Sequence, residues 1–263
     1  MESSSSSLTP WEQVDRKMNE QDMFIQSLSL IKSDLPQLSA VKSCAMIGCG
    51  YGRLDLECVG VGGCCPNVME IAAVEPDEDQ LANLKTRVAQ LLPSVSVDYY
   101  QETAQTWNGA DKLFDAVLLF ECMPFVSGAE RPALFKKLFN NVVAPGGYVM
   151  FFVQYQQSFS NPVNVIDQIL SEMITCLGLP LLEETDRARI SEMMTSAGFQ
   201  LCYDLPIECE MRFDPLDDEF LATFVFWSEG SVSLDQVRKV AVEVFGDGKL
   251  VPYTMSFLVF RKP

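Results

Sequence analysis

The chain has 263 residues, of which 48% are hydrophobic and 21% charged, a balance typical of one globular domain with a sizeable core. Lysine and arginine number 19 against 36 aspartates and glutamates, and with no histidine the net charge is -17. A field of this sign repels phosphate backbones and anionic lipid. It therefore disfavours nucleic acid and membrane surfaces as partners and favours small cations.

Targeting and association signals are absent from the sequence. No stretch approaches the roughly 20 apolar residues of a membrane span, and the serine run at 3–7 lacks the basic and apolar blocks of a signal peptide. We therefore expect a cytoplasmic protein, and with no coiled-coil pattern we expect a monomer. The nine cysteines are expected to be reduced and mostly buried. Because Cys64 and Cys65 are adjacent and no histidine exists, no metal site is expected.

Apolar runs alternate with helical patterns along the chain. Residues 1–40 are expected to form a flexible tail and a leading helical segment. The predicted strands are 43–47, 69–74, 95–100, 114–120, 148–153, 199–203 and 255–260. The predicted helices between them are 78–92, 131–142 and 191–197.

This alternation predicts an α/β fold with a doubly wound, seven-stranded, mostly parallel sheet. The main domain is expected to span 41–263, with its ligand at the carboxyl ends of the strands. Two segments, at about 155–190 and 210–250, do not fit the strand and helix count. Together with the leading segment, we expect them to act as lids over the substrate pocket.

The first predicted strand runs directly into a glycine-rich loop, Gly48-Cys49-Gly50-Tyr51-Gly52. Glycines let the backbone turn tightly and let a ligand approach closer than a Cβ atom permits. A plain strand-to-helix turn is one alternative. A dinucleotide fingerprint is another, although its third glycine would fall on Arg53.

The second predicted strand is followed by Glu75. A carboxylate at this position can accept hydrogen bonds from both hydroxyls of a ribose. Such a carboxylate can bind the ribose of NAD or of S-adenosylmethionine equally well. Motifs in the second half of the predicted sheet are therefore needed to distinguish the two cofactors.

Motifs in both halves resemble the class I S-adenosylmethionine-dependent methyltransferases. These motifs are the glycine loop, Val-Glu-Pro at 74–76, Phe-Asp-x-Val at 114–117 and Pro-Gly-Gly at 145–147, in the family's order. At a greater distance, residues 18–263 resemble the histamine N-methyltransferases. That resemblance is carried by Gln80, Glu102-Thr103, Gly198 with the segment 202–205, and Thr254-x-Ser256-Phe257.

The resemblance implies a cofactor site for S-adenosylmethionine. The implied residues are Gly48, Gly50, Gly52, Glu75, Pro76, Gln80, Thr103, Ala104 and Phe120. The family's serine beside the adenine falls on Ala104, so its hydrogen bond is missing or is made by Thr103. Phe120 is expected to contact the adenosyl group through its backbone or its ring.

The resemblance also implies a substrate site, with more departures from the family pattern. The implied residues are Glu20, Glu121, Phe125, Tyr155, Phe220 and Tyr253. Glu121 replaces the family's glutamine and is the first candidate to orient an amine or a ring N–H. Glu121 could equally be a solvated residue at a strand end. Glu20 could be a residue on a polar helix face, and Tyr253 could be a core residue at the start of the last strand.

These observations predict an N-methyltransferase that acts on a small amine or imidazole compound resembling histamine. Transfer from a sulfonium is an in-line displacement, so the protein mainly orients the acceptor and needs no histidine base. Two alternatives remain open at this stage. One is a catalytically silent binding or regulatory protein, and the other is an O-methyltransferase for small molecules.

Overall fold

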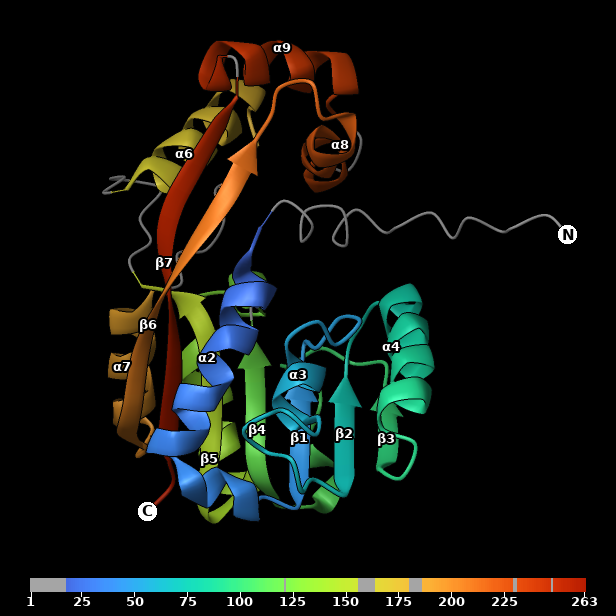
Figure 1. The fold of residues 1–263 in the computed structure, drawn as a ribbon, viewed down its shortest axis with the longest axis vertical. Helices are drawn as coiled ribbons and strands as arrows, with labels where there is room; N and C mark the ends of the chain where they lie inside the picture. Colours follow the sequence, from blue (N-terminus) through green and yellow to red (C-terminus); the bar gives the residue numbers. More distant parts are fainter. Residues whose placement is uncertain (1–17, 121, 156–163, 180–185, 229–230, 247) are drawn as a thin grey trace, which may run out of the picture. The chain divides into compact units, whose positions relative to one another are not determined.

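A computed structural model describes residues 18–120, 122–155, 164–179, 186–228, 231–246 and 248–263. The chain divides into two compact units. The sheet unit comprises 21–156, 183–207 and 254–263, and the cap unit comprises 1–20, 157–182 and 208–253. Each unit is described by itself below, and Figure 1 shows the elements of both.

The seven strands form one mixed sheet in the order β3-β2-β1-β4-β5-β7-β6. The pairs β3–β2, β2–β1, β1–β4 and β4–β5 are parallel, and β5–β7 is antiparallel. The strands are β1 (Ser43–Ile47), β2 (Glu70–Val74), β3 (Ser96–Tyr100), β4 (Phe114–Phe120), β5 (Val143–Gln154), β6 (Gln200–Phe213) and β7 (Lys249–Arg261). This is the doubly wound α/β sheet that the sequence predicts.

Helices alternate with the strands of the sheet unit. They are α2 (Glu20–Asp34), α3 (Asp55–Val59), α4 (Glu78–Leu91), α5 (Arg131–Lys137) and α7 (Arg187–Ser196). The predicted helix at 131–142 changes to a π-helical turn at Leu138–Val142, and α7 starts four residues earlier than predicted, where Asp186 caps it.

Two neighbouring residues of β5 show which helix covers which face of the sheet. Because successive side chains of a strand point to opposite faces, Phe151 and Phe152 pack on different layers. The Phe151 ring packs edge-on against Phe135 of α5, at 5.7 Å between centroids. The Phe152 ring packs against Phe24 of α2, at 5.4 Å. The helices α5 and α2 therefore cover opposite faces and bury the sheet between them.

The connection into β5 differs from the prediction. The motif Pro145-Gly146-Gly147 was expected to precede a strand that begins at 148, but it lies inside β5. Val143 already pairs with Phe114, and the register then shifts so that Tyr148 pairs with Ala116. The positive φ of Gly146, 77°, allows the chain to loop out between these two pairs.

In the cap unit, α9 (Leu234–Phe245) packs against both α6 (Val165–Leu177) and α8 (Asp218–Trp227). A capping box starts α9: the Ser233 hydroxyl accepts from the Gln236 backbone amide, and the Gln236 side chain accepts from the Ser233 amide. None of the helices in the described ranges is long and apolar enough to cross a membrane.

The strand β6 extends well into the segment that was expected to be an insertion from 210 onward. Its buried positions Cys209, Met211 and Phe213 alternate with the exposed Glu210 and Arg212. This alternation is the period of a strand with one covered face, so the segment continues β6 to Phe213. The strand β7 likewise begins at Lys249 rather than at 255.

Candidate cofactor and substrate sites

The glycine loop connects β1 to α3 at the carboxyl ends of the parallel strands. Gly48, Gly50 and Gly52 all have positive φ, at 63°, 51° and 77°. A Cβ atom on Gly48 would lie 2.4 Å from the Cys122 Cβ. Gly50 differs, because the nearest atom to its Cβ position is the Gln80 Oε1 at 3.8 Å. The loop is therefore tightly packed at Gly48 and open at Gly50, where a ligand could approach the backbone.

Glu75 follows β2 directly, and its carboxylate is held by two backbone amides. The Gly50 N–H donates to Oε2 at 2.8 Å, and the Asp77 N–H donates to Oε1 at 3.0 Å. The side chain is buried, and this burial raises the pKa of the Glu75 carboxyl above its usual value. A carboxylate has about four acceptor positions, so two remain for further donors.

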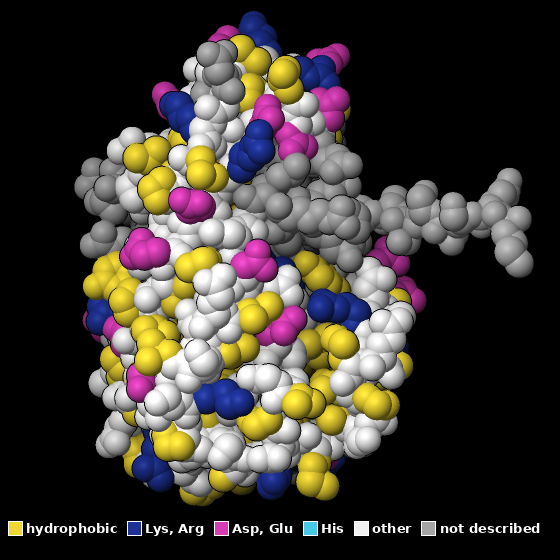
Figure 2. Space-filling model, viewed as in Figure 1, with side chains coloured by type: hydrophobic (Ala, Val, Ile, Leu, Met, Phe, Trp, Pro, Cys, Tyr) yellow, Lys and Arg dark blue, Asp and Glu magenta, His cyan; other side chains and the backbone are white. Residues whose placement is uncertain are grey.

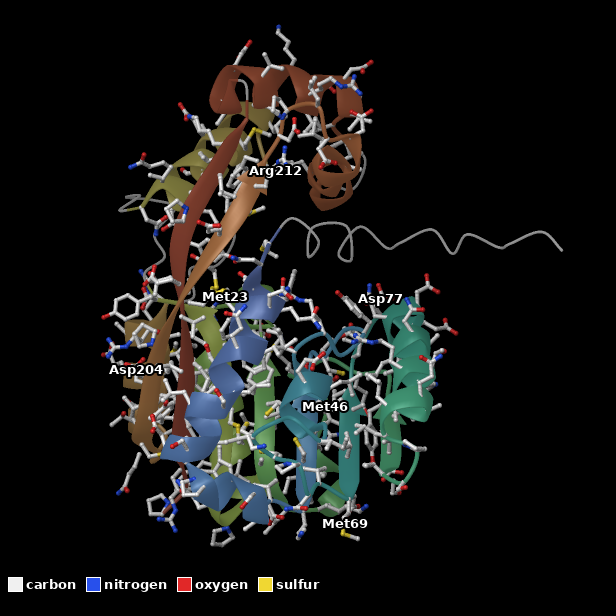
Figure 3. The ribbon with its side chains drawn as sticks, viewed as in Figure 1. Met23, Met46, Met69, Asp77, Asp204 and Arg212 are labelled. Atoms are coloured by element: carbon white, nitrogen blue, oxygen red, sulfur yellow. The ribbon has the colours of Figure 1, made fainter. Side chains whose placement is uncertain are left out.

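The first turn of α4 adjoins this carboxylate. Asp77, labelled in Figure 3 at the start of α4, caps the helix by accepting from the Asp79 and Gln80 amides at 2.9 and 3.0 Å. Gln80 is buried, whereas Pro76 is exposed. The structure therefore brings Gln80 to the open side of Gly50 and leaves Pro76 at the surface.

The loop that follows β3 carries Thr103 and Ala104. The Thr103 hydroxyl accepts from the Thr106 amide at 3.2 Å, so it takes part in a turn within the loop itself. Ala104 is 8% exposed. Both residues follow the carboxyl end of β3, which pairs in parallel with β2.

Lys137 of α5 fixes this loop in a way that the sequence did not reveal. Its Nζ donates to the backbone carbonyls of Ala104, Gln105 and Trp107 at 2.7, 3.0 and 2.6 Å. Burial lowers the pKa of the Lys137 ammonium. Sequence reasoning missed this residue because its partners are some 30 positions away in the chain.

Replacing Lys137 by methionine is expected to destabilise the protein and to weaken cofactor binding. The variant keeps the length of the side chain but leaves three carbonyls without their charged donor. The expected loss in the free energy of unfolding is about 2–4 kcal/mol. Denaturant unfolding measures the first effect and calorimetry with S-adenosylmethionine the second.

Lys136→Met is the matched control, because Lys136 is the preceding residue of α5 and is exposed. This variant should change neither quantity by more than about 0.5 kcal/mol. Equal behaviour of the two variants would contradict the role assigned to Lys137.

Phe120 ends β4 inside an aromatic cluster of the sheet unit. Its ring lies 5.6 Å from Phe24 and 6.0 Å from Phe257, measured between centroids. With 5% of its surface exposed, the side chain packs in the core. This packing favours the backbone of Phe120, rather than the face of its ring, for contact with an adenosyl group.

The segment after β4 contains Glu121, which lies outside the described residues, and Phe125, which is 62% exposed. Arg131, at the start of α5, is buried and donates hydrogen bonds to the backbone of this segment. Its Nε donates to the Val126 carbonyl and its Nη2 to the Met123 carbonyl, both at 2.9 Å. Arg131 thus holds the chain at Met123 and at Val126.

Tyr155 follows β5 in the sheet unit. The guanidinium carbon of Arg187 lies 5.1 Å from the centroid of its ring. This distance is typical of a cation–π contact. The ring of Tyr155 therefore already binds a cation of the protein itself.

Two predicted substrate residues, far apart in sequence, meet in the cap unit. Tyr253 of β7 donates from its hydroxyl to Oε1 of Glu20. Glu20 is 3% exposed and Tyr253 is 6% exposed. Phe220 lies in α8 of the same unit, and its side chain is outside the described residues. Phe125 and Tyr155 belong to the sheet unit.

The face of the sheet unit seen in Figure 2 carries acidic and basic side chains singly, scattered among hydrophobic ones. The negative net charge is thus not gathered into one block on this face. Long-range attraction of a cation would come from the summed charge of the chain.

The sequence was compared with protein families and with curated proteins. Residues 45–147 match a family model described as a methyltransferase domain. No curated protein matches the sequence at a significant level.

Three solved structures illustrate the likeness. The YcgJ protein of Bacillus subtilis is 16% identical, with 90% of this chain and 98% of that chain covered and a TM-score of 0.58. The N-methyltransferase NodS of Bradyrhizobium japonicum WM9, solved with S-adenosyl-L-homocysteine, is 12% identical, covers 93% and 87%, and has a TM-score of 0.55. The magnesium protoporphyrin IX methyltransferase ChlM of Synechocystis PCC 6803 is 10% identical, covers 98% and 89%, and has a TM-score of 0.57.

Identities this low show a shared fold. The matched residues 45–147 include the glycine loop after β1 and the carboxylate after β2. The match thereby confirms the predicted fold and the class of cofactor. Residues 45–147 thus match the methyltransferase domain family, and the solved structures that share the fold include methyltransferases crystallised with S-adenosyl-L-homocysteine.

Proposed function

We propose that the chain transfers a methyl group from S-adenosylmethionine to a nitrogen atom of a small amine or imidazole compound resembling histamine. The observation that carries the choice of acceptor is the buried carboxylate of Glu20, to which the Tyr253 hydroxyl donates. A carboxylate held in this way is suited to a charge-assisted hydrogen bond from an ammonium or a ring N–H. The hydrogen bond from Tyr253 fixes its orientation.

Glu75 is the residue proposed to hold the ribose of the cofactor. Its two oxygens each keep acceptor capacity beyond the bonds from the Gly50 and Asp77 amides. Gly50 lets the cofactor approach the loop, and Gln80 lies beside it. Thr103 and Ala104 are proposed to line the adenine, with Lys137 keeping their loop in place.

The work of the protein in such a transfer is to hold the acceptor nitrogen in line with the methyl–sulfur bond. A neutral imidazole presents its lone pair at pH 7, because its pKa is near 6.5. An aliphatic amine must first lose a proton. Glu121 and Glu20 are proposed to orient the acceptor, since ionised carboxylates are weak bases toward an ammonium.

The direct test is mass spectrometry of amines, imidazoles, phenols and acids incubated with the protein and S-adenosylmethionine. Gain of one methyl group on an amine or imidazole is the expected result. Methylation of phenols or acids alone would move the acceptor to oxygen. Cofactor binding without turnover across the panel would favour the silent alternative.

Replacing Glu20 by glutamine is expected to raise the KM for a cationic acceptor about tenfold or more, because one charge-assisted hydrogen bond contributes about 1.5–3 kcal/mol. The KM for S-adenosylmethionine should stay unchanged. Steady-state kinetics with each substrate varied in turn give both constants. Similar increases in both would remove Glu20 from the acceptor site.

Glu243→Gln is the matched control, since it makes the same change at an exposed position of α9 in the cap unit. Its kinetics should equal those of the unmodified chain. Tyr253→Phe removes the donor to Glu20 and is expected to raise the same KM by a smaller factor.

A further inference from the structure

Three buried cysteines, none of them assigned to the cofactor, meet beside α3. Cys58 belongs to α3, and Cys64 and Cys65 lie in the loop that leads from α3 to β2. Each is at most 1% exposed. Their three Sγ atoms all lie within 4.8 Å of one another, with 3.2 Å between Cys58 and Cys64.

The backbone of the loop builds this cluster. The Cys65 amide donates to the Cys58 carbonyl at 2.9 Å, which folds the loop back onto the helix. Gly63 packs so closely that a Cβ atom would lie 2.0 Å from the Cys58 carbonyl oxygen. Only glycine fits there, so the adjacent Cys64 and Cys65 can both reach the Cys58 thiol.

The spacing of the sulfur atoms suits a shared metal ion. Thiolates that bind one zinc ion at about 2.3 Å lie roughly 3.8 Å from one another. That value falls between the Cys58–Cys64 separation, 3.2 Å, and the upper limit for the cluster, 4.8 Å. A disulfide would instead join two of the sulfurs at about 2.05 Å and leave the third unused.

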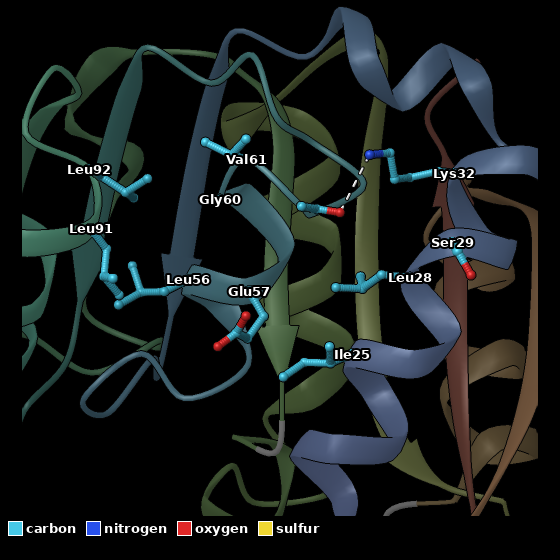
Figure 4. Close-up of a pocket in the computed structure, with 11 residues that line it drawn as sticks. Ile25, Leu28, Ser29, Lys32, Leu56, Glu57, Gly60, Val61, Leu91 and Leu92 are labelled. Carbon is cyan, nitrogen blue, oxygen red and sulfur yellow. Dashed lines mark hydrogen bonds between the residues drawn. The ribbon is translucent and has the colours of Figure 1, made fainter.

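The surroundings of the loop also bear on the charge of the cluster. Lys32 of α2 acts electrostatically on Cys64, and its Nζ donates to the Gly62 carbonyl at 3.4 Å. Together with a bound cation, this ammonium would offset negative charge of the three thiolates. Gly60 and Gly62, in the same stretch of chain between Cys58 and Cys64, line a groove of about 600 Å³ together with Lys32 (Figure 4).

We propose that Cys58, Cys64 and Cys65 form a binding site for a thiophilic d10 metal ion, Zn²⁺ or Cu⁺, held by three thiolates. Soft thiolate ligands select these ions over harder ones. The spacing argument from sequence missed the site, because Cys64 and Cys65 are adjacent and Cys58 returns to them only through the fold. The site is independent of the proposed methyl transfer.

The test begins with the full chain, titrated under anaerobic conditions with Cd²⁺ as a spectroscopic probe. Thiolate-to-metal charge-transfer absorption that saturates at one Cd²⁺ per chain is the expected result. Competition with chelators of known affinity, run separately for Zn²⁺ and Cu⁺, then identifies the preferred ion. Absence of the charge-transfer band, or no competitive binding of either ion, would overturn the proposal.

Variants locate the site. Cys64→Ser and Cys58→Ala should each abolish the band, and Cys209→Ser, a buried cysteine of the cap unit, should keep it. Circular dichroism of each variant shows whether it has folded. A band that survives in folded Cys64→Ser and Cys58→Ala would overturn the assignment. A thiol titration of the unfolded chain, in the absence of oxidant, should find nine free thiols. A count of seven would reveal a disulfide and would also overturn it.

Discussion

Glu75→Gln is expected to weaken the binding of S-adenosylmethionine by about a hundredfold or more while the protein stays folded. Two hydrogen bonds from ribose hydroxyls to a carboxylate contribute about 1.5–3 kcal/mol each. Glutamine keeps the volume but presents an amide donor toward the Gly50 or Asp77 amide, both of which are donors themselves. Isothermal calorimetry measures the affinity, and circular dichroism checks the fold.

Glu78→Gln provides the control, because Glu78 is an exposed residue in the first turn of α4, three positions after Glu75. Its affinity for the cofactor should equal that of the unmodified chain. An unchanged affinity in folded Glu75→Gln would contradict the ribose assignment.

The same residue predicts a pH dependence of binding. Burial raises the pKa of Glu75, so on acidification this carboxyl takes up a proton earlier than an exposed glutamate does. The protonated form loses acceptor capacity, and cofactor affinity should fall as the pH falls through that pKa. Glu75→Gln should lack this fall.

Asp55→Asn is expected to stabilise the protein at neutral pH, by about 2–4 kcal/mol at pH 7. Asp55 starts α3, is 3% exposed, and its Oδ1 has no hydrogen-bond partner among the described residues. Burial raises the pKa of this carboxyl from 3.8 to about 8. The folded protein therefore holds the Asp55 proton at neutral pH.

The sign of the effect follows from proton binding. Between pH 3.8 and about 8, the unfolded chain releases the Asp55 proton while the folded chain keeps it. Unfolding of the native sequence thus becomes more favourable as the pH rises, by up to about 1.4 kcal/mol per pH unit. Asparagine has no such proton, so the advantage of the variant should vanish below about pH 4.

Urea unfolding of both proteins from pH 4 to pH 8 measures this difference. Asp22→Asn, at an exposed position of α2, is the control and should follow the native pH dependence. A stability difference between Asp55→Asn and the native chain that does not change with pH would contradict the buried, protonated state of Asp55.

Two adjacent strands in the middle of the sheet, β1 and β4, could be predicted from the sequence to the residue. The bounds of β1 and β4 agree with the predicted 43–47 and 114–120. Both strands are covered on both faces, so they appear as continuous apolar runs with sharp ends. The glycine loop and Glu75 were found for the same reason, since they follow such runs directly.

Other features depend on contacts that no local pattern contains. The outer part of β6 alternates buried and exposed residues, a signal that was present in the sequence but masked by its acidic content. Only the fold brings together the residues joined by the hydrogen bonds of Lys137 and of Arg131. The same holds for the three thiols of Cys58, Cys64 and Cys65. For Glu20 and Tyr253, the resemblance supplied the residues, and their hydrogen bond emerged only in the structure.

The hydrogen bond between the Gly50 amide and Glu75 has a consequence for the thermodynamics of cofactor binding. The loop is already ordered by folding, through this bond and through the bond from the Gly48 amide to the Val74 carbonyl at 2.8 Å. Binding therefore has little backbone entropy left to remove from the loop. Little of the free energy of the ribose contacts is then offset by the cost of ordering the loop, so these contacts contribute almost fully to the binding free energy. Association also needs no slow rearrangement of the glycine loop.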